Sequence, residues 1–420
     1  MKKTFAIIIA AMLCLPNPAK AQSNETEITV TNAEGKEEVI DLPEGMISEV
    51  DSLLHLYNAK TYLKPDTDCN MPDVNPVYDK EVYKERLSRI PTIIEMPYND
   101  IVQKFIDRYS GRLRRSVSYM LGAQNFYIPI FEQALETYGL PLELKYLPVI
   151  ESALNPQAVS RVGATGLWQF MLATGKNYGL EVNSLVDERK DPIKASYAAA
   201  HYLSDLYKIF GDWNLVIAAY NAGPEKINKA IHRSKGKTDY WEIYPYLPKE
   251  TRGYVPAFIA ANYIMNYYCE HNISPMDMNM PESTDTLHIS RPLSLQQVAA
   301  VCNIHIEQLR ALNPEFKKDI IPGNEGTYAL RLPTPSVSTF IDREDSIYSY
   351  KADTYIGRRT TVSVKDNTRN TSGKATYHKI RNGETLGSIA AKYGVSVAQL
   401  RRLNGIKGNS IRAGRSLRIR

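Results

Sequence analysis

The residue with the clearest chemical potential in this sequence is Glu151, which stands where a leucine would continue an apolar helical stripe. Leu140, Leu144 and Leu147 precede it at helical spacing, so all four side chains are predicted to share one helix face. Burial disfavours an ionised carboxylate and raises its pKa, which suits a general acid. A Glu at a frayed helix end that reaches back to water is the alternative. The Asn155–Pro156 step predicts the end of this helix.

A long motif begins at Glu151 and reads E-S-x-x-N-P-x-A-x-S-x-x-G-A-x-G-L-W-Q. Two glycines inside it suit a tight turn that leads into another helix. Two further segments follow in order, AYNAG at 219–223 and ETRGYVP at 250–256. Together they resemble the lysozyme-like soluble lytic transglycosylases. The resemblance implies that Glu151 is the only catalytic carboxylate, and that the cleft is lined by Ser160, Gln169, Met171, Tyr220, Asn221 and Tyr254.

The resemblance also implies a reaction on peptidoglycan. It is non-hydrolytic cleavage of the β-1,4 bond between N-acetylmuramic acid and N-acetylglucosamine, which leaves 1,6-anhydromuramyl ends. Ordinary glycosidases use two carboxylates, whereas no second acid lies within the motif here. Two other functions stay open: a goose-type lysozyme, in which water is the acceptor, and a wall-binding scaffold without catalysis.

Helices must position these residues, and their predicted starts lie on both sides of the motif. Asn99–Asp100, Asp191–Pro192 and Asp212 are typical N-terminal caps. We expect an N-terminal helical region at 78–138 and a lysozyme-like transglycosylase domain at 139–280. The predicted fold class is multidomain, with a mainly α lysozyme-like catalytic domain and small βααβ modules.

These small modules are two copies of one pattern, at 295–332 and 386–419, each reading strand, helix, helix, strand. The second, at 377–420, resembles the LysM module, which implies binding of N-acetylglucosamine-containing glycans through Gly383, Glu384, Thr385, Leu386, Asn409, Ser410 and Ile411. The first, at 284–335, has R-P-L-S in place of the N-G-E-T turn. We expect it to be a degenerate module kept for packing or weak binding. A catalytic domain followed by LysM repeats is similar to the membrane-bound lytic murein transglycosylase D type.

Residues 336–376 are predicted to be a linker, because their second half, SVKDNTRNTSGKAT, is short of apolar residues. A tether of this kind would keep the enzyme on its insoluble substrate by avidity. Residues 377–420 hold ten Lys and Arg against one acid, whereas the whole chain has a net charge of only +5. With no stacking motif, this favours an anionic wall polymer or a membrane surface over nucleic acid. A merely solvated basic face is the alternative.

The first residues read as an export signal. Lys2–Lys3 is a basic start, Phe5–Leu15 an apolar core too short to span a bilayer, and Ala19–Lys20–Ala21 a cleavage site. A soluble periplasmic enzyme cleaved after Ala21 is therefore expected, with proximity to a membrane left open. Lipidation at Cys14 is disfavoured by the bulky residue before it. Residues 22–77 are polar and are expected to be a mobile or loosely packed lead-in.

The composition bears on cofactors and on sugar binding. The 7 His and 4 Cys are scattered, so we predict no metal and no other cofactor. Tyrosine is abundant, with 28 Tyr against 9 Phe and 3 Trp, and its apolar face and hydroxyl suit a sugar ring. Most of these tyrosines are expected to be half-buried helix residues. The protein is expected to be a monomer whose partners are peptidoglycan glycan strands.

Overall fold

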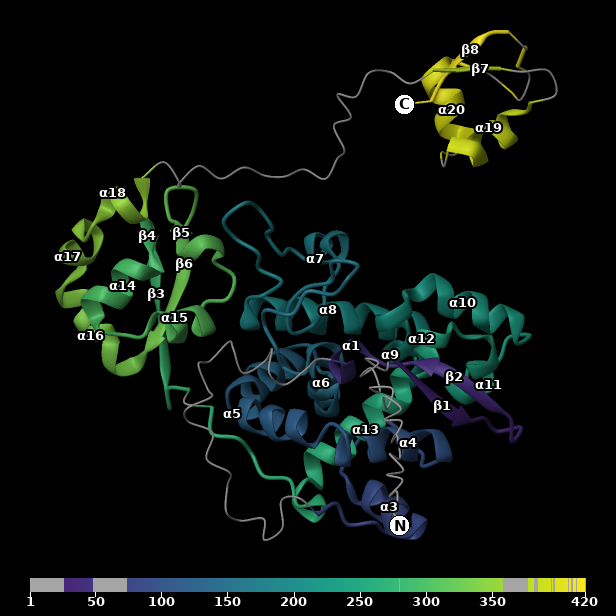
Figure 1. The fold of residues 1–420 in the computed structure, drawn as a ribbon, viewed down its shortest axis with the longest axis horizontal. Helices are drawn as coiled ribbons and strands as arrows, with labels where there is room; N and C mark the ends of the chain where they lie inside the picture. Colours follow the sequence, from purple (N-terminus) through teal and green to yellow (C-terminus); the bar gives the residue numbers. More distant parts are fainter. Residues whose placement is uncertain are drawn as a thin grey trace, which may run out of the picture. The chain divides into compact units, whose positions relative to one another are not determined.

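The computed structural model describes residues 26–47, 74–278, 280–357, 377–380, 384–393, 395, 397–406, 408, 411–412 and 414–419. The chain divides into two compact units, residues 1–363 and 364–420 (Figure 1). The expected signal peptide with its cleavage site and Cys14, and the SVKDNTRNTSGKAT tether, lie outside the described residues. None of the helices in the described ranges is both long and apolar enough to cross a membrane.

The first unit contains a mainly helical domain built around α13 (Tyr254–Asn266). The α13 side chains from Tyr254 to Met265 are all buried, as expected for a helix that is apolar on every side. It packs against α4, α6 and α9. From Lys80 onward, the other helices are α3 (Lys80–Arg89), α4 (Asp100–Ser110), α5 (Arg114–Thr137), η3 (Leu142–Tyr146), α6 (Leu147–Ser152), α7 (Leu172–Asn177), α8 (Pro192–Phe210), α9 (Trp213–Ala222), α10 (Pro224–Arg233), α11 (Tyr240–Ile243), η4 (Tyr244–Tyr246), α12 (Lys249–Arg252) and η5 (Cys269–His271). The predicted mainly α catalytic domain is confirmed.

The predicted helix starts are confirmed by side-chain caps. The Oδ1 of Asn99 accepts a hydrogen bond from Val102 N at 2.9 Å. The Asp191 carboxylate accepts from the first backbone N–H groups of α8, and Asp212 does the same for α9. These caps set where α4, α8 and α9 begin.

The helix that carries Glu151 is shorter than the leucine spacing predicts. A 3-10 turn, η3, comes first, and α6 then ends at Ser152 rather than at Asn155–Pro156. Ala153 and Leu154 adopt left-handed backbone conformations with φ of 50° and 59°, which terminate the helix before the proline can. Glu151 therefore lies in the last turn of α6, next to a sharp change in chain direction.

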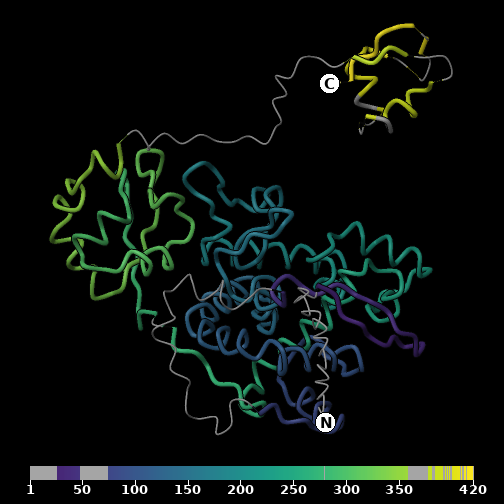
Figure 2. Tube along the Cα trace, in the orientation of Figure 1, coloured from purple at the N-terminus to yellow at the C-terminus, as the bar shows by residue number. Residues whose placement is uncertain are grey.

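The expectation of a loosely packed lead-in at 22–77 is wrong for residues 26–47. Strands β1 (Glu27–Thr31) and β2 (Glu37–Asp41) pair as an antiparallel hairpin, and α1 (Glu44–Ile47) follows. Val30, Ile40 and Met46 are at most 1% exposed within the catalytic core. Alternating apolar residues on the hairpin supply this buried face. The hairpin lies beside α12 (Figure 2).

The first LysM-like module completes the first unit. Its strands β3 and β6 pair antiparallel, as do β4 and β5. Its elements are β3 (Thr284–Ile289), β4 (Pro292–Ser294), α14 (Leu295–Cys302), α15 (Ile306–Leu312), η6 (Lys317–Asp319), β5 (Ile320–Pro322), β6 (Tyr328–Pro333), α16 (Thr334–Asp342), α17 (Glu344–Ser349) and α18 (Ala352–Tyr355). The linker predicted from 336 is wrong up to 357, because α16 and α17 bury Phe340 and Ile347 in the core of this module.

The second unit has the predicted βααβ order of β7 (Tyr377–Lys379), α19 (Leu386–Tyr393), α20 (Val397–Asn404) and β8 (Ser416–Arg418). An asparagine has the same structural role in both modules. Asn404 bonds to Leu400 O and to both backbone groups of Arg418. Asn313 makes the same set of bonds in the first module. The modules therefore share one fold.

Candidate active site

Glu151 lines a cleft of about 350 Å³ in the catalytic domain. All the side chains predicted for this site in the catalytic domain line the same cleft. They come from separate segments: α6, the loop between α6 and α7, the end of α9 and the start of α13. The residues are Glu151, Ser160, Gln169, Met171, Tyr220, Asn221 and Tyr254.

The carboxyl group of Glu151 has the electrostatic character of an acid that holds its proton at neutral pH. Burial raises its pKa to about 8, and the more distant charges of Glu250 and Glu44 add to this effect. Tyr254 opposes the rise, because its hydroxyl donates a hydrogen bond to Glu151 Oε1. Tyr254 itself stays neutral, since burial and the nearby carboxylate hold its pKa well above the usual range. It can therefore donate to Glu151 in either state of the carboxyl.

Tyr220 and Asn221 enter the cleft from the last turn of α9. The hydroxyl of Tyr220 donates to the carbonyl of Trp168 at 2.8 Å, which ties α9 to the loop opposite. The amide oxygen of Asn221 accepts from Thr251 Oγ1 at 3.1 Å. Asn221 does not cap α9; Gly223, with φ of 83°, stands at the C-terminal end.

The loop between α6 and α7 is a compact turn that presents Ser160 and Gln169. Ser160 Oγ accepts from Ala164 N at 3.0 Å. Gln169 has a positive φ of 47°, an uncommon conformation that is typical of functional sites. Its Nε2 donates to Gly166 O at 2.8 Å, whereas its buried Oε1 has no hydrogen-bond partner among the described residues. A buried acceptor of this kind is normally satisfied, so a ligand N–H would suit it.

Three residues of the N-terminal segment also line the cleft, and the sequence analysis missed them: Leu42, Pro43 and Glu44. They are held there because α1 packs on the backbone of α6. A Cβ at Gly45 would overlap the carbonyl oxygens of Val149 and Ile150. Glu250, from the E-T-R-G-Y-V-P segment, lines the cleft as well, and both carboxylates are exposed. The cleft is thus lined by two carboxylates, Glu44 and Glu250, in addition to the Glu151 that the motif predicted.

The predicted glycan-binding residues of the second unit are only partly described. Gly383, Asn409 and Ser410 lie outside the described residues. Glu384 is held by His378, whose Nε2 lies 2.7 Å from its carboxylate, and Thr385 is exposed. Ile411 lines a pocket of about 280 Å³. Leu386 is 2% exposed with its side chain in the module core, which leaves only its backbone to meet a glycan.

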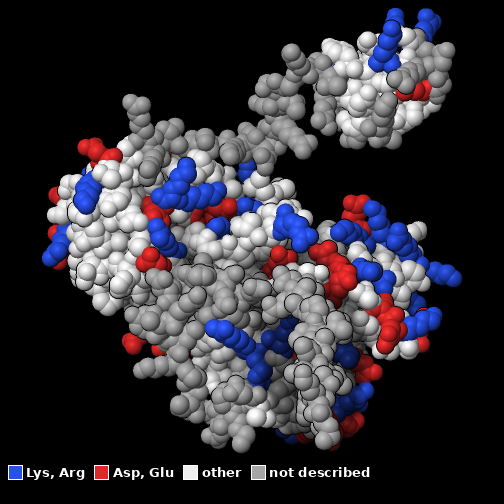
Figure 3. Space-filling view, in the orientation of Figure 1, with Lys and Arg blue, Asp and Glu red and all other residues white. Residues whose placement is uncertain are grey.

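The charge of the second unit is visible on its surface. Exposed basic side chains include Arg402, Arg412 and Arg415. On the face drawn in Figure 3, blue Lys and Arg side chains stand out on this unit beside a small acidic area. Within the described part of the chain, no group of three or more His, Cys, Asp or Glu could hold a metal ion.

Comparisons with known proteins agree with this architecture. The family described as Transglycosylase SLT domain matches residues 129–243. The family described as Lytic transglycosylase MltD, LysM-like domain matches 283–349, and the LysM domain family matches 378–420. The boundary at 349 agrees with the helices that replace the expected linker start.

Individual relatives are also similar. The chain is 31% identical to membrane-bound lytic murein transglycosylase D of Escherichia coli K12 over 332 residues, which are 77% of this chain and 70% of that protein. It is 34% identical over 124 residues to the soluble lytic murein transglycosylase of the same strain, covering 28% of this chain and 19% of that one. Among solved structures, the E. coli 70 kDa soluble lytic transglycosylase has a TM-score of 0.32 at 26% identity, covering 42% of this chain and 30% of that one.

Proposed function

The chain belongs to the family of membrane-bound lytic murein transglycosylase D, and from this premise we propose which of its residues perform the reaction. The protein is a peptidoglycan lytic transglycosylase. It cleaves the β-1,4 bond between N-acetylmuramic acid and N-acetylglucosamine and leaves 1,6-anhydromuramyl ends. A LysM-like module and a LysM module accompany the catalytic domain, and the second of them binds peptidoglycan.

Glu151 acts first as an acid and then as a base. Its neutral carboxyl donates a proton to the bridging oxygen, and the bond from that oxygen to the muramyl C1 breaks, so that the N-acetylglucosamine end leaves as an alcohol. The acetamido group of the muramyl residue stabilises the oxocarbenium-like centre. The Glu151 carboxylate then accepts the proton of the muramyl 6-hydroxyl, whose oxygen bonds to C1 and closes the ring. No water is consumed.

The observation that carries this proposal is the carboxyl group of Glu151, whose pKa is raised to about 8. It is held in the cleft beside the neutral hydroxyl of Tyr254. Tyr254 steadies this carboxyl in both of its states. Gln169 Oε1 accepts the N–H of an acetamido group, and the amide N–H of Asn221 donates to the carbonyl of one. Ser160 and Met171 form the wall against which the sugar rings lie.

The hydrolytic alternative is a goose-type lysozyme. Glu44 and Glu250 give this alternative a structural basis, because a second carboxylate on the cleft wall could activate water. Mass spectrometry of muropeptides released from purified sacculi separates the two reactions. Anhydromuropeptides support ring closure; products heavier by one water would show hydrolysis instead. Glu151→Gln should release neither product and still sediment with sacculi.

We propose further that the enzyme is an exported, periplasmic monomer with a signal peptide removed after Ala21. The basic start and apolar core of residues 1–15 support export. The basic 377–420 module holds the enzyme on the wall and favours a position near an anionic membrane surface. N-terminal sequencing of the mature protein tests this, because a chain that begins with a lipidated Cys14 would contradict it. Light scattering tests the monomer.

A further inference from the structure

The first LysM-like module is joined to the catalytic domain by a loop that enters its core. Leu185 and Val186 follow α7 in the catalytic domain, yet they are 2% and 0% exposed among the core residues of the module. Val186 pairs with Phe316 as an antiparallel bridge. On either side of this bridge, Asp187 N donates to Glu315 O at 2.9 Å and Lys317 N donates to Leu185 O at 2.7 Å. The two domains therefore share a small piece of sheet.

The module makes this junction with residues 315–317, directly before the segment that corresponds to the predicted groove wall of the second module. Leu295 and Gly323 correspond to Leu386 and Gly414, so residues 318–320 correspond to the predicted groove wall at 409–411. In the first module, β5 starts at this segment and pairs directly with β4, which stands on the opposite side of the groove. The adjoining residues 315–317 are bonded to the catalytic loop. Backbone pairing thus occupies the position at which a glycan would lie.

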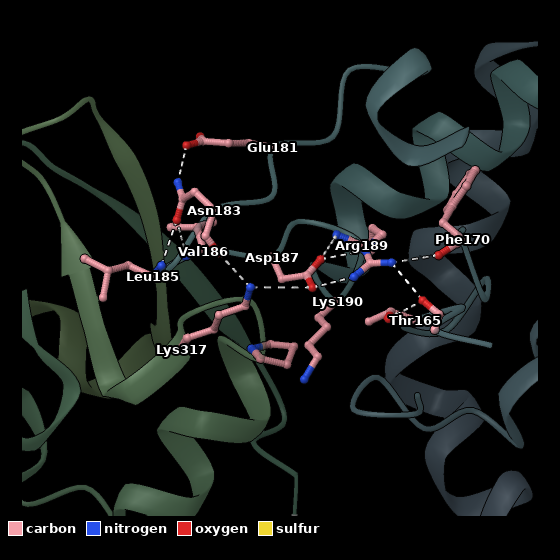
Figure 4. Close-up of polar contacts among 12 residues, drawn as sticks. Thr165, Phe170, Glu181, Asn183, Leu185, Val186, Asp187, Arg189, Lys190 and Lys317 are labelled. Carbon is pink, nitrogen blue, oxygen red and sulfur yellow. Dashed lines mark hydrogen bonds and ion pairs between the residues drawn. The ribbon is translucent and has the colours of Figure 1, made fainter. Parts of the chain in front are cut away.

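A series of charged contacts runs from the module into the catalytic domain (Figure 4). Lys317 Nζ donates to Asn183 O at 2.7 Å and lies 3.8 Å from Asp187 Oδ2. Both carboxylate oxygens of Asp187 accept from Arg189, at 2.9 Å from Nε and 2.8 Å from Nη2. Asp187 and Arg189 are 4% and 8% exposed. This bidentate geometry holds the guanidinium in one orientation.

The remaining nitrogen of that guanidinium reaches the loop that presents Gln169. Arg189 Nη1 donates to Gly163 O at 3.0 Å and to Phe170 O at 3.1 Å. Gly166 lies against the backbone of Arg189 so closely that a Cβ there would overlap Arg189 O. One buried side chain therefore fixes both ends of the turn between Ser160 and Met171.

We propose that the first LysM-like module is a positioning domain for the catalytic cleft, and that Arg189 and Asp187 are positioning residues through which its docking holds the Ser160–Met171 loop. The proposal rests on the proposed role of that loop in binding substrate. Glu151 stands on α6, outside these contacts, so its chemistry is not what the module controls. The module acts on the position of the glycan strand in the cleft.

The test compares three variants of the full-length protein. Arg189→Lys keeps the positive charge but lacks the planar guanidinium, whose separate N–H groups reach Asp187 and the two loop carbonyls at the same time. Lys317→Met removes the positive charge that the module places beside Asp187. The ion pair between Asp187 and Arg189 remains, so no buried charge is left without a partner. Arg310→Met is the matched control, because it breaks an ion pair with Asp319 inside the same module, at 2.6 Å. Steady-state rates on soluble glycan strands are measured together with amide hydrogen exchange of residues 158–171.

Arg189→Lys should raise KM about tenfold and Lys317→Met about threefold, with kcat within twofold and the alkaline pKa of the rate profile unchanged. Exchange at residues 158–171 should accelerate in both, and the control should match wild type in every measurement. Unchanged exchange and KM in Arg189→Lys would overturn the proposal, as would a fall in kcat with KM constant. The exchange measurement needs no substrate. It therefore tests whether the docked module holds the loop even where the product analysis contradicts the proposed reaction.

Discussion

Tyr254 donates its hydroxyl hydrogen to Glu151 Oε1, although 103 residues separate the two in the chain. The contact joins the first residue of the buried helix α13 to the last turn of α6. Because the tyrosine stays neutral, the bond survives both protonation states of the carboxyl and strengthens when the carboxyl is charged. In the proposed mechanism, this pair therefore sets how easily one carboxyl can alternate between acid and base.

Tyr254→Phe should destabilise the ionised form of Glu151 relative to the protonated form. The hydrogen bond lowers the pKa of Glu151, so its loss raises that pKa and moves the alkaline limb of the rate profile to higher pH. Because ring closure needs the carboxylate, kcat should fall roughly 10-fold to 100-fold. Tyr263→Phe, on the same helix but bonded to Arg86 and His271, is the control. An alkaline limb that stays in place would show that the bond does not tune the acid.

In the wild-type enzyme, kcat/KM should fall as the pH rises through about 8. The first step needs a protonated Glu151, and burial raises the pKa of this group to about 8, so the active form is present below that pH and lost above it. Initial rates on soluble glycan strands across the neutral and alkaline range check this. Activity that rises through the same window would mean that the free enzyme needs the carboxylate.

Glu151→Gln should stabilise the protein, and increasingly so at higher pH. In wild type the unfolded chain loses the Glu151 proton near pH 4.5 while the folded protein keeps it until about pH 8. The unfolded state therefore binds fewer protons in that window, and the free energy of unfolding falls as pH rises through it. Glutamine does not ionise, so its burial carries no such pH-dependent cost. The free energy of unfolding of the variant should therefore exceed that of wild type by on the order of 1–3 kcal/mol at high pH. Thermal melts at several pH values measure it, and a pH-independent difference would contradict it.

The parts of this fold that sequence could predict are those with a local cause. Caps such as Asp191 and the spacing of the Glu151 motif depend on neighbouring residues, so they were visible. The pairing of Tyr254 with Glu151 is not local, and only the family resemblance brought the two together. The linker prediction from 336 was wrong because Phe340 on α16 and Ile347 on α17 are buried in the core of the first module, and this packing is a tertiary contact that the local sequence does not indicate.

The contribution of Glu44 to the cleft had no motif to indicate it. The alternation in E-I-T-V-T and E-E-V-I-D, around a turn with N-A-E-G, indicates a hairpin, although the segment as a whole is polar. Even a correct hairpin would not have revealed the cleft wall. That depends on the packing of α1 on α6, which is a tertiary contact.

Gly45→Ala should displace this wall. The new Cβ would overlap backbone oxygens of α6, which cannot move as a flexible side chain can, so a loss of about 1–3 kcal/mol is expected. Activity should fall as well, because Glu44 and Pro43 move with α1. In Gly326→Ala, the control, the added Cβ would meet only the edge of the Tyr328 ring at 3.9 Å. Equal melting temperatures for the two variants would mean that α1 is not held against α6.

Removal of residues 364–420 should separate wall binding from catalysis. The unit has its own hydrophobic core, and the catalytic cleft is lined entirely by residues of the first unit. Rates on soluble glycan strands should therefore stay within about twofold of wild type.

On intact sacculi, the truncated enzyme loses the second binding event, and its apparent affinity should fall by roughly 100-fold, at the lower end of avidity gains. Sedimentation with sacculi measures this affinity; because the unit is strongly basic, the difference between the two proteins should narrow as salt screens its charges. Equal sedimentation of both proteins at low salt would mean that the catalytic unit alone holds the enzyme on the wall.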